Sequence, residues 1–329
     1  MSTFRIQSWN WRSTLLSILA AVAALGLVSA FAPNPAESFL LLLGGPLRSR
    51  LILGNTLAYA SLLCFSGLGI SLAFRAGSFN LGGEAQVAVP ALLVVVAGAA
   101  GDWIPGPLGI PLLLGLGAAA GALLAAVSGL LRAHLDIDEL LSSFLISAGL
   151  IPVVDFLVTG PLRDTGSSLL ATVPVSDAYR FPLLLPPSRL SLVLPLAVLA
   201  VLALSAWERR SRAGYELRLL GANERFARYG GIPLPAARAG AMAVSGALHG
   251  MAGAAAVLGS FGAMFSGMTA GVGWNGIAVA LLAGLQPVLV LPAALVMAWI
   301  VTGAASAQVL SGLSTSLTTL LQGTVLLIL

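Results

Sequence analysis

The chain alternates between long apolar runs and short polar interruptions. A helix that crosses a bilayer needs about 20 apolar residues, and most of these runs reach that length. The pattern predicts membrane-spanning helices over 14–32, 51–74, 80–100, 108–131, 139–158, 190–207, 239–260, 273–287, 289–306 and 308–328. The run 273–287 is short for a full crossing, and two prolines, Pro287 and Pro292, lie at or just after its end. We therefore expect this run to be tilted, re-entrant or merged with its neighbour.

Two polar stretches between the runs are longer than a simple turn requires. Residues 159–189 (TGPLRDTGSSLLATVPVSDAYRFPLLLPPSR) contain several prolines and serines. They predict either a lid or docking surface, or a partly ordered connector. Residues 208–238 (ERRSRAGYELRLLGANERFARYGGIPLPAAR), called the polar segment below, hold seven of the 16 basic residues of the chain.

The polar segment has the punctuation of two short helices. Tyr215 to Leu220 predicts a first, amphipathic helix, after which Gly221-Ala222-Asn223 supply a stop and a cap. Glu224 to Tyr229 predicts a second helix, which Gly230-Gly231-Ile232-Pro233 ends. Two short crosswise helices form a compact knob that suits a groove on a soluble partner. The alternative is a loop that only anchors topology, for which fewer arginines and less punctuation would be enough.

Composition identifies the runs as those of a membrane protein. The 329 residues are 58% hydrophobic and only 9% charged, whereas a soluble domain is about 25% charged. We therefore predict an all-α fold, a polytopic helical membrane protein of about ten spans, with residues 1–329 forming one transmembrane domain. The 38 glycines favour close packing of such helices.

Every basic side chain is an arginine, and the chain has no lysine. This excludes a P-loop lysine, a Schiff-base lysine and a lysine general base. If ATP drives the protein, another chain must hydrolyse it. The sequence pI of about 10.0 would indicate nucleic-acid binding in a soluble protein. In a membrane protein, arginines at the cytoplasmic surface explain it, and we expect no nucleic-acid partner.

Arginine placement also predicts orientation. With ten spans and the N-terminus inside, 11 arginines are cytoplasmic, namely those at 5, 12, 75 and 132 and the seven of the polar segment. The other five arginines are outside, and the excess on the cytoplasmic side agrees with the positive-inside rule. The loop 159–189 is then outside as well. The first run follows Arg5 and Arg12 and ends at Ala30-Phe31-Ala32, a form found at signal-peptide cleavage sites. An uncleaved first span is the simpler interpretation.

The segment 74–86 (FRAGSFNLGGEAQ) interrupts two apolar runs with polar side chains, namely Arg75, Asn80, Glu84 and Gln86. Its glycines, at 77, 82 and 83, permit backbone conformations that a regular helix does not use. At membrane depth this would be a broken helix whose polar groups line an aqueous cavity. At the cytoplasmic surface it would be a turn with Asn80 as a helix cap, and Glu84 would still lie one turn inside.

The segment 267–284 (GMTAGVGWNGIAVALLAG) places Trp274 and Asn275 among glycines just before an apolar run. A tryptophan at such a position commonly anchors a helix at the membrane interface. An aromatic–amide pair also suits stacking on, and hydrogen bonding to, a planar ligand. Both interpretations stay open.

Enzyme chemistry finds little support in the sequence. Ser245 and His249 lie one helical turn apart, as an intramembrane serine protease would need, but the small residues around them fit helix packing better. Two histidines are too few for a His-rich metal site. Asp136, Asp138 and Glu139 cluster where acids stabilise a helix start. We expect no catalytic residue, no metal and no cofactor in this chain.

Four segments, in order, resemble one known family. FRAGSFNLGGEAQ is similar to the signature F-R-A-G-x-F-N-I/L-G-x-E-x-Q of bacterial ABC-transporter permeases of the nucleoside and simple-sugar importer group, in the branched-chain amino acid and ribose permease superfamily. GYELRLLGANERFARYGGI resembles the cytoplasmic segment of that family. Residues 135–164 resemble its E-x-I/L-x-S/T span and loop entry, and GWNGIAVALLAG resembles G-Y/F/W-x-G-I-A-V-A-L-L/A-G. The matches cover about residues 50–290.

The resemblance implies a ten-span permease of the type II, vitamin B12 importer-like class, which is not itself an enzyme. It implies a second permease subunit, often a paralogue, and an extracytoplasmic substrate-binding protein, often a lipoprotein. The polar segment would be the coupling helix seated in a cytoplasmic ABC ATPase, which binds the ATP. The protein would reside in the bacterial plasma membrane and import nucleosides. The alternatives are a simple sugar or other small metabolite as cargo, or a stand-alone secondary transporter.

Candidate roles follow for particular residues. We assign the substrate pathway to Phe79, Asn80, Glu84, Gln86, Trp274 and Asn275. We assign ATPase coupling to Arg218, Gly221, Asn223, Arg228, Tyr229 and Gly231. The sequence departs from the family pattern in Gly82-Gly83-Glu84-Ala85-Gln86, where small residues replace small ones, and at Thr159 and Gln286, which leave the cargo less secure than the fold.

Overall fold

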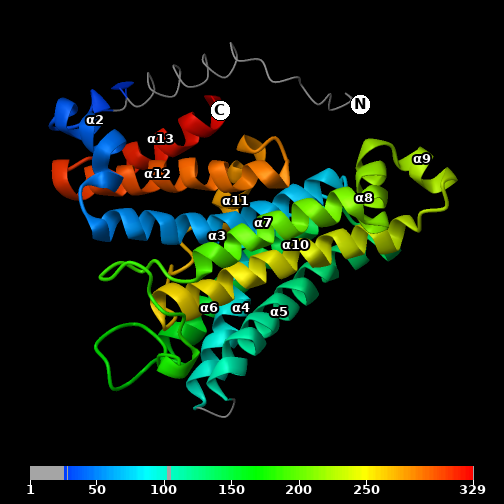
Figure 1. Cartoon of the computed structure of the whole chain (residues 1–329), viewed down its shortest axis with the longest axis horizontal. Coiled ribbons are helices and arrows are strands. Elements are labelled where there is room, and N and C mark those ends of the chain that lie inside the picture. Colours follow the sequence, from blue (N-terminus) through cyan, green and yellow to red (C-terminus); the bar gives the residue numbers. More distant parts are fainter. Residues whose placement is uncertain (1–25, 28, 102–104, 329) are drawn as a thin grey trace.

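The computed structural model describes residues 26–27, 29–101 and 105–328. Within these ranges the chain is mostly helical, and its only β contacts are isolated bridges. Figure 1 shows a helical bundle from which α8 and α9 project at one end, while α2 and several loops lie at the other. We call these the knob end and the far end.

The helices described are α2 (Pro35–Gly44), α3 (Arg50–Arg75), α4 (Gly83–Ala99), α5 (Gly106–Leu135), α6 (Glu139–Thr159), α7 (Val193–Arg210), α8 (Arg212–Ala222), α9 (Glu224–Tyr229), α10 (Leu234–Ala256), α11 (Val272–Leu282), α12 (Pro287–Ser311) and α13 (Thr315–Ile328). Short turns are η1 (Gly45–Leu47), η2 (Asp177–Tyr179) and η3 (Val257–Phe261), the last a π-helical continuation of α10. Among the described residues, five helices are long and apolar enough to cross a membrane: α3, α5, α6, α10 with η3, and α12.

The predicted runs from 51–74 onward each contain a helix, which confirms the mostly helical, membrane-type fold. The short run 273–287 is the 11-residue α11, separated from α12 by a turn in which Gly284 and Leu285 adopt positive φ. It is therefore not merged with its neighbour. The run 14–32 lies mostly outside the described residues, as do Arg5 and Arg12.

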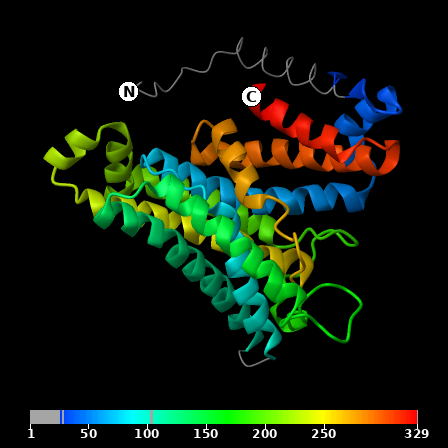
Figure 2. The same ribbon diagram turned by 180° about the vertical axis from the view of Figure 1, so that it is seen from behind.

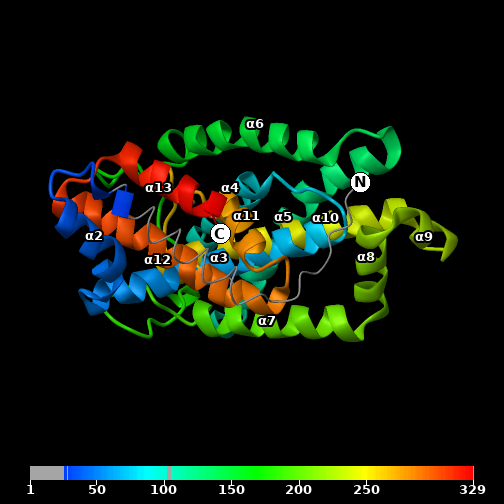
Figure 3. The same ribbon diagram turned by 90° about the horizontal axis from the view of Figure 1, so that it is seen from above.

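Helices α3 and α10 form the centre of the bundle, since most of their residues are buried. Figure 3 shows α6 and α7 on opposite flanks of this centre. Glycines bring α5 against α10, because a Cβ added at Gly117 or Gly121 would lie 2.9 Å from backbone atoms of Gly250. The two backbones touch, which is the close packing that small residues permit between membrane helices.

Two helices begin inside the bundle instead of at one of its ends. A Cβ added at Gly83, the first residue of α4, would lie 2.8 Å from Nε2 of His249, near the middle of the continuous helix Leu234–Phe261. A Cβ added at Gly273, in the first turn of α11, would overlap the backbone of Gly83 and Glu84. The N-termini of α4 and α11 therefore meet head to head near mid-height.

From this meeting point the two helices leave in opposite directions. The end of α4 lies at the far end, where the Ser176 amide of the loop 159–189 donates to the Gly98 carbonyl at 3.1 Å. The end of α11 lies at the knob end, where Arg75 Nη1 is 3.5 Å from the Leu285 carbonyl oxygen. At 17 and 11 residues, both helices are shorter than the five that are long enough to cross a membrane, and we call them the half-length helices below.

The loop 159–189 is held across the far end by its backbone. The Thr172 amide donates to the Met264 carbonyl at 2.8 Å, and the Val175 amide donates to that of Gly262 at 2.7 Å. Tyr179 is fully buried. Figure 2 shows the loop beside the 262–271 connection that it pairs with. A partly ordered connector would lack these bonds, whereas a lid or docking role for the loop stays a prediction.

Candidate functional site

The polar segment folds as the two short helices that its punctuation predicts. The Ser211 side chain accepts a hydrogen bond from the Gly214 amide at 2.9 Å and starts α8, three residues earlier than expected. Asn223 Oδ1 accepts from the Phe226 amide at 3.1 Å and caps α9. Side-chain oxygens satisfy helix-start amides in this way, so the predicted cap at Asn223 is confirmed.

The two helices and the turn after them form a knob with a small core of its own. Leu220, Ala227, Ile232 and Leu234 are buried together. Gly231 reverses the chain at a φ of +79°, a conformation that a side chain would strain. The knob is therefore a compact unit, as predicted, and not a loose loop.

The outer surface of the knob carries exposed aromatic rings and arginines. Tyr229 is 92% exposed and Phe226 is 59% exposed. The Arg228 side chain is also mostly exposed and lies 3.7 Å from Glu224. Exposed aromatic side chains next to arginines are typical of a surface that a partner covers.

The base of the knob is fixed to the start of the 74–86 segment. A Cβ on Gly221 would overlap the Arg75 carbonyl oxygen, so α8 touches the end of α3 directly. Arg75 Nη1 lies 3.2 Å from Glu208 Oε2, and Arg218 donates to the Glu208 carbonyl oxygen. Glu208 lies just past the predicted span 190–207. Burial raises the pKa of its carboxyl, an effect that Arg75 and Arg218 oppose.

The structure places the two ends of the 74–86 segment at different heights in the bundle. Arg75 lies at the knob end, beside Gly221, and Glu84 lies near mid-height at the start of α4. Between them Asn80 is fully buried and forms two hydrogen bonds with the Gln86 amide group, at 2.7 and 3.0 Å. Asn80 also donates to Ser245 Oγ at 2.9 Å. It does not cap α4, which starts without a side-chain cap.

Two serines of α6 satisfy backbone amides that the broken helix leaves free. The Leu81 amide donates to Ser143 Oγ at 3.0 Å, and the Ala85 amide donates to Ser147 Oγ at 3.1 Å. Buried amides need such partners because an unpaired one costs free energy. The sequence did not mark these serines as site residues, although both lie in the segment 135–164 that resembles the family.

Glu84 joins the two half-length helices. Its Oε2 accepts from the Gly273 amide at 2.9 Å, and its Oε1 accepts from the Gly271 amide at 3.2 Å. The carboxylate, only 6% exposed, thus sits on the positive N-terminus of α11. Two motifs separated by nearly 200 residues are one site, a pairing that no signal in a single sequence reveals.

Of the other three predicted pathway residues, Phe79 and Trp274 are exposed and Asn275 is half-buried. Phe79 packs on Phe74 with ring centroids 5.0 Å apart, and Trp274 packs edge-on against Phe144 at 6.1 Å. Asn275 Nδ2 donates to the Tyr59 hydroxyl at 2.9 Å. Asn80, Glu84 and Gln86 thus fix buried backbone or one another, Phe79 and Trp274 are exposed on the single chain, and Asn275 bonds to α3. A pathway role for any of them stays a prediction.

The geometry does not assemble a protease pair. His249 Nδ1 faces the Ser245 backbone carbonyl at 2.8 Å, while the Ser245 hydroxyl is bonded to Asn80. The imidazole therefore cannot take a proton from that hydroxyl, as a general base would. Within the described ranges no cluster of three potential metal ligands occurs.

Comparison with known proteins adds relatives along nearly the whole chain. The family described as "Branched-chain amino acid transport system / permease component" matches residues 52–329. The chain is 31% identical to the probable riboflavin import permease of Treponema pallidum, over 96% of this chain and 84% of that protein. It is 32% identical to the guanosine ABC transporter permease of Bacillus subtilis, over 89% and 84%. It is 29% identical to a glucose ABC transporter permease of Haloferax volcanii, over 98% and 88%. No solved structure matches.

Proposed function

Because the chain belongs to the family of branched-chain amino acid transport system permease components, we propose that it forms half of the membrane passage of an ATP-driven importer. A cytoplasmic ABC ATPase binds and hydrolyses the ATP, since this chain has no lysine for a P-loop. The chain itself supplies no catalytic residue and no cofactor. It lies in the bacterial plasma membrane, with its N-terminus and the knob in the cytoplasm.

The observation that carries the proposal is the knob. It is compact, displays Phe226 and Tyr229, and touches the end of α3 through Gly221. In our assignment Tyr229 and Arg228 contact the ATPase. Asn223 and Gly231 hold the shape of the knob, while Arg218 and Gly221 fix its base to the bundle.

We propose ten spans in a type II arrangement, paired with a second permease that is a copy or a paralogue. Exposed aromatic rings at Phe79, Phe144 and Trp274 support a covered or solute-lined surface on this side of the chain. A substrate-binding protein delivers cargo at the far end, where 159–189 is held in place for docking. Residues 1–329 act as one transmembrane domain surrounded by lipid.

We propose a nucleoside as cargo. Relatives named for riboflavin, guanosine and nucleosides support a solute with a planar heterocycle. A relative named for glucose supports a simple sugar as the second candidate. A stand-alone secondary transporter would need neither a knob of this kind nor an ATPase.

Co-purification tests the proposal. The tagged chain, purified from the membranes of its source organism, should retain an ABC ATPase. Replacing both Phe226 and Tyr229 by alanine should release the ATPase without reducing the amount of chain in the membrane. Phe156→Ala is the control, because Phe156 is about as exposed as Phe226 but lies on α6 toward the far end. If the wild-type chain retains no ATPase and takes up solute on an ion gradient, the importer proposal fails.

A further inference from the structure

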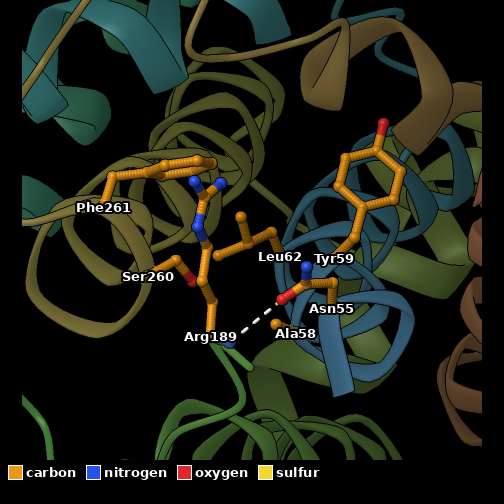
Figure 4. Close-up of a pocket in the computed structure, with 7 residues that line it drawn as sticks. All are labelled: Asn55, Ala58, Tyr59, Leu62, Arg189, Ser260 and Phe261. Atoms are coloured by element: carbon orange, nitrogen blue, oxygen red, sulfur yellow. Dashed lines mark hydrogen bonds between the residues drawn. The ribbon is translucent and has the colours of Figure 1, made fainter. Parts of the chain in front are cut away.

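A small cavity opens at the far end, and Tyr59, the hydrogen-bond partner of Asn275, forms part of its wall. Figure 4 shows its lining: Asn55, Ala58, Tyr59 and Leu62 of α3, Arg189 just before α7, and Ser260 and Phe261 of η3. The four α3 residues recur at helical spacing, so one face of that helix forms a wall. The cavity volume is about 180 Å³.

Arg189 is exposed, and its side chain lines the open side of this cavity. Its backbone amide donates to Asn55 Oδ1 at 3.0 Å, which fixes the main chain. Its guanidinium lies over the Phe261 ring, 4.6 Å from the ring centre. In the part of the chain that the structure describes, the guanidinium has no ion pair and no hydrogen bond. By contrast, Arg180 of the same loop lies 3.8 Å from Asp177.

Two aromatic rings lie on opposite sides of the cavity. Figure 4 shows Tyr59 on one side and Phe261 on the other. The Tyr59 hydroxyl is already engaged, because it donates to the Ala270 carbonyl at 3.3 Å and accepts from Asn275 at 2.9 Å. Tyr59 therefore offers the cavity its ring and not its hydroxyl.

We propose that this cavity is a capture site for the heterocycle of the cargo, a planar ring with a carbonyl oxygen beside a ring nitrogen. This inference rests on the proposed function. The Tyr59 ring stacks on such a plane, since the Arg189 guanidinium already covers the Phe261 ring, and the planar fork of an arginine matches two adjacent acceptors. Cavities that enclose whole drug-sized ligands hold about 300–1,000 Å³. The heterocycle enters this smaller one, and its sugar stays outside.

The test is uptake by the chain reconstituted with its ATPase, its second permease and saturating, guanosine-loaded binding protein. A bidentate arginine contact to a base discriminates by roughly 5- to 150-fold. Arg189→Gln should therefore lower guanosine uptake about tenfold, while ATP hydrolysis stimulated by the binding protein stays within twofold. Arg189→Lys, which keeps the charge but loses the fork, should behave similarly. Arg48→Gln, at an exposed far-end arginine outside the cavity, should change neither rate.

Uptake of adenosine tests the specificity of the site, because its base carries an amine where guanosine has the carbonyl. Arg189→Gln should change adenosine uptake less than threefold. The capture site is overturned if guanosine uptake and ATP hydrolysis fall together, if both nucleosides lose uptake equally, or if the wild type imports only sugar. Wild-type nucleoside uptake that needs no ATP would instead refute the importer proposal, and the guanosine-to-adenosine ratio of the Arg189 variants would still decide the site.

Discussion

Replacing Glu84 by glutamine should loosen the start of α11. The carboxylate accepts two amides, from Gly271 and Gly273, on two different oxygens. Glutamine has one acceptor oxygen, so its amide nitrogen would face an amide donor. Hydrogen bonds to a charged group contribute about 1.5–3 kcal/mol, against about 0.5–1.5 kcal/mol for neutral pairs. Losing one bond and weakening the other costs about 2–4 kcal/mol, since little solvent reaches the site to replace them.

Hydrogen exchange followed by mass spectrometry measures this cost locally. A loss of about 2 kcal/mol corresponds to a roughly 30-fold rise in opening. Amides of 271–276 in detergent-purified Glu84→Gln protein should exchange at least that much faster than in the wild type, while α5 peptides stay unchanged. Glu216→Gln is the control, because Glu216 pairs with the 92% exposed Arg212 side chain at the surface. Exchange at 271–276 within threefold of wild type would refute the bridging role of Glu84.

Three further predictions concern glycines and the cap of the knob. Gly121→Ala should lower the thermal midpoint, because the methyl would strike the α10 backbone and overpacking costs about 1–3 kcal/mol; Gly115→Ala, facing open space on the same helix, should not. Gly221→Ala should preserve membrane insertion but lower ATP-driven uptake, since α8 must move off Arg75; Gly230→Ala, with ordinary contacts only, is its control. Asn223→Ala should remove the cap of α9, which costs about 1 kcal/mol of helix stability, and so weaken binding of the ATPase. Asn223→Asp keeps an acceptor oxygen and should bind the ATPase as the wild type does.

Apolar run length and helix-boundary residues predicted an element well where its position depends only on neighbouring residues. Apolar run length located the long helices, and Gly221 with Asn223 located the break between α8 and α9. These signals come from a residue and its sequence neighbours. The helix α2 was missed although it begins at Pro35 and is followed by Gly45, because its ten residues are too few for a membrane span and only span-length runs were predicted in that region.

The candidate site was only partly predictable, because its contacts join distant segments. The sequence marked Glu84 and Gly273 separately, but the hydrogen bond between them depends on how four helices pack. The serines of α6 were missed for the same reason, since a serine on an apolar helix carries no mark of the amide it accepts from. The cavity at Arg189 combines α3, η3 and a loop, and none of these pieces is unusual alone.

Because Gly221 touches the backbone of Arg75, the knob and the end of α3 must move together. The knob has its own core, so a push on Tyr229 moves it as one body. The knob meets the bundle at the end of α3, and residues 76–82 run from there to mid-height, where hydrogen bonds from Asn80 to Ser245 and from the Leu81 amide to Ser143 fix this segment to α10 and α6. The displacement would arrive at Asn80 and Glu84, where α4 and α11 point in opposite directions. A continuous chain of contacts thus joins the outer surface of the knob to the point where the N-termini of α4 and α11 meet.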